Sequence, residues 1–105
     1  MSQFTVYHNK NVTTKKNIPY LLDVQSGLLD ELDTRVVIPL YAHIALKGKA
    51  FTRLTPIIEI GEEKYILMTP QLAGISKKEL GSSVTVLDQH REVIVNALDF
   101  LISGI

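Results

Sequence analysis

The sequence predicts a mainly β domain over residues 1–105, an antiparallel barrel or sandwich closed by one C-terminal helix. Three observations predict this fold class. Short segments in the first two-thirds of the chain alternate apolar and polar residues, as half-buried strands do. Two such segments flank a Gly-containing turn at residues 61–63, which is typical of a hairpin. Residues 87–103 contain neither Gly nor Pro and carry apolar residues at helical spacing.

The N-terminal part predicts two strands separated by a polar loop. Residues 4–7 alternate in polarity, which predicts a short half-buried strand. Residues 8–19 are rich in Lys and Asn and predict a loop. In residues 20–26, Leu22 and Val24 fall on one face of a strand. Asp23 and Gln25 fall on the other face.

The next segments predict a turn, a buried strand and an irregular stretch. Residues 27–33 break the alternation and predict a turn that begins with two exposed leucines. Residues 35–41 are apolar on both faces, so we expect a strand that is covered on both sides. Pro39 has no N–H to donate, so it predicts a bulge or an edge position in that strand. Residues 42–56 predict irregular structure with a turn at Gly48.

A hairpin and a further strand follow. Residues 57–69 predict the hairpin, because two alternating runs flank Gly61, Glu62 and Glu63. Residues 71–86 predict one more short strand and a turn.

The C-terminal helix is predicted over residues 87–103, with Asp88 as its N-cap. At 100° per residue, its polar side chains form a stripe about 80° wide, and its apolar side chains fill an arc of about 220°. A surface helix needs an apolar arc of only about 100°, so either loops or a second chain must cover the rest. We expect a second chain, in a symmetric homodimer. The polar stripe contains Gln89, Glu92, Asn96, Asp99 and Ser103, and the arc contains Val93, Ile94, Val95, Ala97, Leu98, Phe100, Leu101 and Ile102.

Composition narrows the function classes. Basic and acidic residues balance at 11 each, which argues against nucleic-acid binding as the main task. The chain has no Cys, so it forms no disulfide and no thiolate metal site, as suits a reducing cytosol. Its first residues, MSQFTVYHN, form no apolar run of signal-peptide length, and no stretch approaches the roughly 20 apolar residues that a membrane span needs. We therefore expect a soluble protein of the cytoplasm that does not bind membranes.

Residues for catalysis are not arranged in a known pattern, so we expect no enzyme and no cofactor. The histidines lack metal-ligand spacing, and the carboxylates cluster only in predicted turns, where they are solvated. No Gly-rich phosphate loop and no nucleophile elbow is present. The residues considered were His8, His43, His90, Asp30, Glu31, Asp33, Glu62 and Glu63.

Four stretches carry a family resemblance. They are QFTVY at residues 3–7, DVQS at 23–26, VVIPL at 36–40 and the final Gly-Ile. With these stretches, their spacing and its length, the chain resembles the CcdB family of bacterial toxins, which belong to toxin–antitoxin modules and poison DNA gyrase. The resemblance implies an SH3-like barrel with a long C-terminal helix, like that of the MazF toxins, and a homodimer packed partly through that helix.

The resemblance also implies a mechanism and a set of contact residues. The toxin dimer binds the gyrase A subunit and stabilises the intermediate in which DNA is cleaved, without chemistry of its own. Gly allows close backbone approach, and the final Ile offers a small apolar plug. At the family's Trp position this chain has Ser103, and the lost contact is worth about 2 kcal/mol or more unless other residues compensate. The implied gyrase contacts are Ser103, Gly104, Ile105, Asp99, Leu28 and Leu29. Alternatively, the two leucines pack beneath a loop.

The antitoxin of this family, CcdA, is a second implied partner. Its flexible C-terminal segment wraps the toxin, and the two proteins together repress their own operon, with the DNA contacts made by the antitoxin. By the resemblance, this segment contacts His8, Asn9, Lys10 and Asn11.

Two other functions stay open. The MazF and Kid toxins cut RNA on the same scaffold, and an RNA-cleaving site needs a general acid or base together with cations. Arg35, Arg53, Arg91 and His43 are possible parts of such a site, although no spacing selects them. The third possibility is an inactive dimer that only binds an antitoxin.

Overall fold

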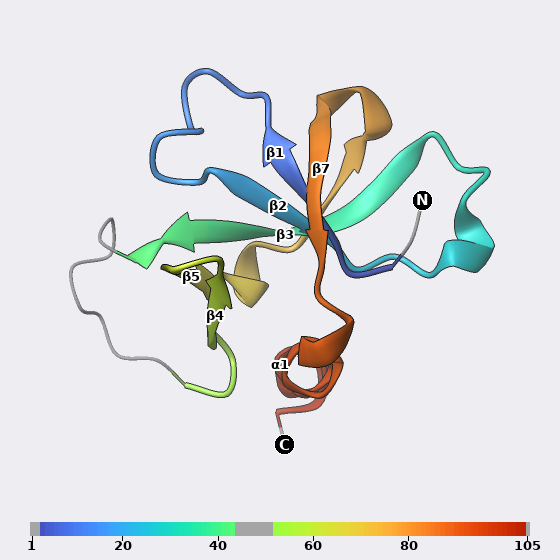
Figure 1. Ribbon diagram of the computed structural model, residues 1–105. Helices are drawn as coiled ribbons and strands as arrows, with labels where there is room; N and C mark the ends of the chain where they lie inside the picture. Colours follow the sequence, from blue (N-terminus) through green and yellow to red (C-terminus); the bar gives the residue numbers. More distant parts are fainter. Residues whose placement is uncertain (1–2, 44–51, 105) are drawn as a thin grey trace.

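The computed structural model describes residues 3–43 and 52–104, and it confirms a mainly β fold with one C-terminal helix. Figure 1 shows a curled antiparallel sheet with the helix α1 lying beneath it. The described strands follow the order β4-β5-β3-β2-β1-β7, and β6 pairs with β3 beside β5. The strands are β1 (Thr5–Asn9), β2 (Tyr20–Asp23), β3 (Thr34–Ala42), β4 (Ile57–Ile60), β5 (Glu63–Leu67), β6 (Ala73–Ser76) and β7 (Leu80–Val86), and α1 spans Arg91–Ser103.

The central strand is β3, and its proline lies at a local edge in the pairing rather than at a bulge or on an outer strand. Pro39 sits opposite Leu21 of β2 in a continuous register. On its other side, β6 pairs with β3 only up to Val37, and β5 begins to pair only at Leu40. Pro39 therefore lies where one partner strand has ended and the next has not begun, so its missing N–H leaves no ladder bond unmade. Its carbonyl still accepts the N–H of Met68 at 3.0 Å.

The sheet is packed on both faces, so the first strand is not half-buried as predicted. Val6 faces the main core, and Tyr7 on the opposite face packs with Val37 and Leu80 in a second cluster. The curl of the sheet folds β6 and β7 over this second face, which alternation in one strand cannot reveal. The main core lies between the sheet and α1 and includes Phe4, Val6, Leu22, Ile38, Leu40, Ile58, Leu67, Leu87 and Ile94.

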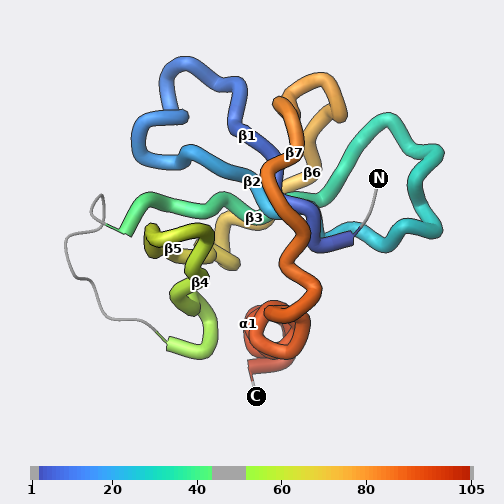
Figure 2. The backbone as a smooth tube through the Cα atoms, viewed as in Figure 1, coloured from blue at the N-terminus to red at the C-terminus, as the bar shows by residue number. Residues whose placement is uncertain are grey.

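Residues 71–86 form two strands, where one was predicted. Figure 2 shows β6 and β7 joined by a turn, which is the short 3-10 helix η4 (Lys77–Glu79). The alternating signal is weak here, because β6 has only four residues and the seven residues of β7 include the small run Gly81, Ser82 and Ser83. Pairing with β3 and β1 makes them strands. The predicted hairpin of β4 and β5 is confirmed, and the turn predicted at Gly48 lies outside the described residues.

The start of the helix also differs from the prediction. Asp88 is not the N-cap of α1; it opens a 3-10 turn, η5 (Asp88–His90), and α1 begins at Arg91. Leu87 explains the offset, because its N–H still bonds to the carbonyl of Phe4 at 2.8 Å and holds the chain in the sheet. With 13 residues, α1 is too short to cross a membrane, and no described helix is long and apolar enough to do so.

The apolar arc of α1 is only partly covered. Ile94 and Ala97 are buried against the sheet. Val93, Leu101 and Ile102 remain exposed on the described chain, at 42%, 37% and 83%. The described chain therefore leaves much of the arc in contact with solvent, as the width of the arc predicted.

A tight contact between β1 and β7 gives a testable prediction about stability. A Cβ at Gly81 would lie 2.9 Å from both the Cβ and the backbone oxygen of His8. We expect Gly81→Ala to lower the free energy of unfolding by about 1–3 kcal/mol, because the backbone must shift. Gly74→Ala is the matched control, since a Cβ there meets nothing within 4 Å. Urea denaturation measures both, and equal stability of the two variants would contradict the prediction.

Candidate functional site

The predicted gyrase contacts lie in two separate places on the described chain. One is the C-terminal end of α1, which carries Asp99, Ser103 and Gly104. The other is the 3-10 turn η1 (Gly27–Leu29), which carries Leu28 and Leu29. In Figure 1, η1 lies on the right and α1 at the bottom, so one chain does not join them into a single patch. Ile105 lies outside the described residues.

The end of α1 is an open, capped helix terminus. Gly104 has φ 73°, and its N–H bonds to the carbonyl of Phe100 at 2.9 Å, which is the left-handed cap that favours Gly. A Cβ at Gly104 would meet nothing within 4 Å, so a partner can approach the backbone closely. The Ser103 hydroxyl donates back to the carbonyl of Asp99 at 2.7 Å. In this conformation Ser103 directs its hydroxyl to its own helix.

Ile102 belongs to this surface, although it was not among the residues singled out for binding. It follows Asp99 by three positions, so the two side chains are neighbours on the helix. With 83% of its surface exposed, it is the most exposed apolar residue of the described helix. The sequence placed it in the wide apolar arc, which does not show which members of the arc the sheet leaves uncovered.

The turn η1 presents its leucines to solvent, so they do not pack beneath a loop. Leu28 is 95% exposed and Leu29 is 50% exposed. The Ser26 hydroxyl accepts the N–H of Leu28 at 3.1 Å and caps the turn. No residue of η1 is buried, so apolar packing does not hold this turn.

A buried ion pair beneath η1 is the main feature that sequence reasoning missed. Arg35 and Asp23 are both fully buried. The Arg35 Nε lies 2.8 Å from Asp23 Oδ2, and the Nη2 lies 3.0 Å from Asp23 Oδ1, so the pair is bidentate. The same Nη2 donates to the carbonyl of Gln25 at 3.0 Å.

Gln25 and Arg35 fasten η1 to the sheet. The Gln25 side chain accepts the N–H of Val36 at 3.0 Å and donates to the carbonyl of Leu29 at 3.1 Å. The Arg35 Nη1 lies 3.5 Å from a carboxylate oxygen of Asp30, directly after η1. The signal in the sequence was the polar pair Asp23 and Gln25 on the second face of the segment 20–26, because both residues need partners if that face is covered.

The predicted antitoxin contacts run from the end of β1 into the following loop. Asn9 is buried and holds that loop, because its Nδ2 donates to Thr14 Oγ1 at 3.0 Å and to the carbonyl of Ile18 at 2.8 Å. His8 is exposed and packs edge-on against Tyr20. Lys10 donates to the carbonyl of Lys78 at 3.0 Å. Of the four residues, Asn9 is buried and supports the loop, whereas His8, Lys10 and Asn11 are exposed at the surface.

A cleft of about 250 Å³ adjoins this loop. Asn9 and Asn11 form part of its rim, and Leu21, Val37 and Ile75 contribute apolar walls. Its size and lining suit an apolar side chain.

Two tyrosines stay neutral across the physiological range. Burial, with the negative charge of Asp23 next in size, raises the pKa of Tyr7. Burial, followed by a hydrogen bond with Tyr20, raises the pKa of Tyr65 to about 12. Neither phenol therefore serves as a base near pH 7.

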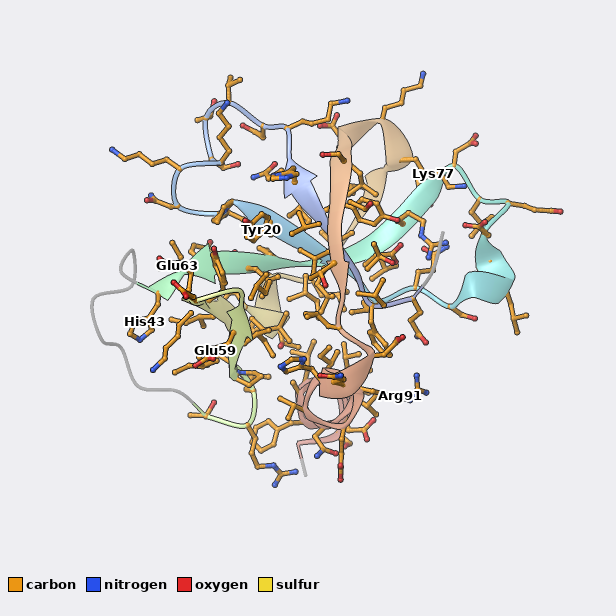
Figure 3. All side chains as sticks on the ribbon, in the orientation of Figure 1. Tyr20, His43, Glu59, Glu63, Lys77 and Arg91 are labelled. Carbon is orange, nitrogen blue, oxygen red and sulfur yellow. The ribbon has the colours of Figure 1, made fainter. Side chains whose placement is uncertain are left out.

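The residues considered for RNA cleavage do not form one groove. Arg35 is buried in its ion pair, and Arg53 and Arg91 stack on Phe100 and Phe4 at 5.2 and 5.3 Å. Figure 3 places His43 far from Arg91, on the side of the molecule that carries Glu63. Among the described residues, no three His, Asp or Glu side chains gather as metal ligands.

A comparison with protein families agrees with the fold and with the resemblance noted in the sequence. The family model described as "CcdB protein" matches residues 3–104, nearly the whole chain. The mainly β sheet with one C-terminal helix is consistent with the fold of that family. The chain therefore belongs to the CcdB family, the toxins of the ccd type of toxin–antitoxin module.

Proposed function

We propose that this toxin binds the A subunit of DNA gyrase and stabilises the enzyme–DNA intermediate in which both strands are cut. The observation that carries the proposal is the family match over residues 3–104. The toxin acts as a wedge that makes and breaks no covalent bond. It shifts gyrase toward the cleaved state because it binds that state better than the others. Gyrase works on the chromosome, so the toxin acts in the cytoplasm.

Two exposed surfaces support this proposal. The end of α1 offers Ile102 and an unobstructed Gly104, and η1 offers Leu28. An apolar side chain that is fully exposed in the free protein gains the most from burial against a partner. Asp99 adds an exposed carboxylate beside Ile102 for a cation on gyrase.

The toxin acts as a homodimer in this proposal. Val93 and Leu101 are exposed on α1, outside the part of the helix that packs on the sheet. Closed two-fold symmetry is the commonest way to cover such a surface. A dimer also presents each gyrase contact twice, which suits a target that is itself symmetric.

The antitoxin CcdA neutralises the toxin, and the complex represses the operon. We place part of its contact at His8, Lys10 and Asn11, beside the apolar cleft that adjoins the loop. A flexible segment that orders on binding can follow this irregular surface. The balanced charge of the toxin leaves the DNA contacts to the antitoxin.

A DNA cleavage assay tests the proposed function. Purified toxin is incubated with gyrase, supercoiled plasmid and ATP, and the protein is then denatured and digested. We expect linear DNA to accumulate with toxin concentration, and a labelled RNA in the same tube to stay intact. RNA cut without gyrase would favour the MazF-like function instead, and no effect on either substrate would favour a dimer that only binds its antitoxin.

A further inference from the structure

Lys77 connects the turn before β7 to the loop that follows η1. Its Nζ donates to the carbonyl of Asp30, 47 positions away in the sequence. Its backbone N–H donates to the carbonyl of Asp33 at 2.9 Å. Figure 3 shows the labelled side chain extending toward this loop. One residue of η4 therefore holds both ends of the segment 30–33.

The position of this bond matters because Asp30 ends η1. The N–H of Asp30 closes the turn on the carbonyl of Gly27 at 3.3 Å, and its carboxylate lies near Arg35. Since no residue of η1 is buried, polar bonds rather than packing decide where Leu28 points. Arg35 and Gln25 hold the turn from the sheet, and Lys77 holds it from the neighbouring η4.

We infer that Lys77 is a positioning residue for the gyrase contact made by Leu28 and Leu29. The inference rests on the proposed function. A side chain that is already ordered loses less conformational entropy when it binds, so a fastened turn binds more tightly than a loose one. Lys78 provides a comparison, because its ammonium group makes no hydrogen bond or ion pair with the described residues.

The test compares Lys77→Met with Lys78→Met in the gyrase cleavage assay. We expect Lys77→Met to need about fivefold more toxin for half-maximal linear DNA, as for the loss of one ordered contact, and Lys78→Met to stay within about twofold of the wild type. Lys77→Arg still carries donors for the Asp30 carbonyl, so it should act nearly like the wild type. Equal activity of Lys77→Met and the wild type would overturn the inference.

A mutant cycle separates positioning from a direct contact or general damage. In a Leu28→Ala background, Lys77→Met should cost less than about twofold, because the side chain that it positions is gone. A full fivefold loss in that background would show that Lys77 acts independently of Leu28. The unfolding midpoint of Lys77→Met in urea should match that of Lys78→Met.

Amide hydrogen exchange tests the same bond without gyrase. We expect faster exchange at residues 27–30 in Lys77→Met than in Lys78→Met, because η1 opens more often once its end is released. Unchanged exchange would overturn the inference even if gyrase is poisoned. If exchange becomes faster but the wild-type toxin traps no cleaved DNA, the bond from Lys77 to Asp30 does hold η1 in place. The role of η1 at gyrase is then contradicted, and the result counts against the proposed function.

Discussion

Arg35→Ala should lower the free energy of unfolding by about 3–5 kcal/mol, because it leaves a buried carboxylate without its partner. Asp23 has no exposed surface, and Arg35 supplies two of its close contacts at 2.8 and 3.0 Å. Within residues 3–43 and 52–104, the remaining donor to Asp23 is the backbone N–H of Gln25 at 3.0 Å. The same substitution removes the bond to the Gln25 carbonyl, so the loss extends to the support of η1. Urea denaturation followed by circular dichroism measures the change.

Two further proteins separate the ion pair from general effects of removing an arginine. Arg91→Ala removes an exposed arginine that stacks on Phe4, and it should cost about 1 kcal/mol or less. Replacing both partners, as Asp23→Leu with Arg35→Met, should recover much of the loss, because no charge is then left buried. The explanation fails if Arg35→Ala costs no more than Arg91→Ala, or if the double variant is less stable than the single one.

Local sequence patterns correctly predicted the elements whose signals lie within one continuous stretch of the chain. The hairpin of β4 and β5 is an example, because Gly61 adopts φ 64° in a two-residue turn and Ile60 pairs with Glu63. The apolar run of β3 predicted a strand covered on both faces, and the uninterrupted C-terminal segment predicted α1. Each of these signals is complete within one continuous segment of the sequence.

The missed features depend on contacts between distant segments. β6 becomes a strand because Val37 and its neighbours pair with it, and Asp23 is buried because the sheet curls over the second face of β2. The candidate site likewise contains one residue whose exposure is a local property and one whose exposure depends on tertiary packing. The exposure of Leu28 followed from its place in a polar turn, whereas the exposure of Ile102 depends on which side of α1 packs on the sheet. Residue type alone does not show which apolar residues of the arc are buried and which are exposed.

The end of α1 yields the prediction with the largest effect on function. We expect Ile102→Asp to raise the toxin concentration needed for half-maximal DNA cleavage by at least about 30-fold, the equivalent of a binding hot spot of about 2 kcal/mol. The substitution removes an apolar side chain that is 83% exposed and places a second carboxylate beside Asp99. Because the side chain touches little of its own chain, the stability of the fold should barely change.

Val12→Asp is the matched control, since Val12 is 80% exposed in the loop after β1, away from both proposed gyrase surfaces. It should poison gyrase like the wild type and should unfold at the same urea concentration. Ser103→Trp tests the same surface in the opposite direction, because a large aromatic side chain beside Ile102 adds contact area and should lower the toxin concentration needed. Sedimentation of each variant reports the dimer. If Ile102→Asp poisons gyrase normally, or turns a dimer into a monomer, then Ile102 is not a gyrase contact at the end of α1.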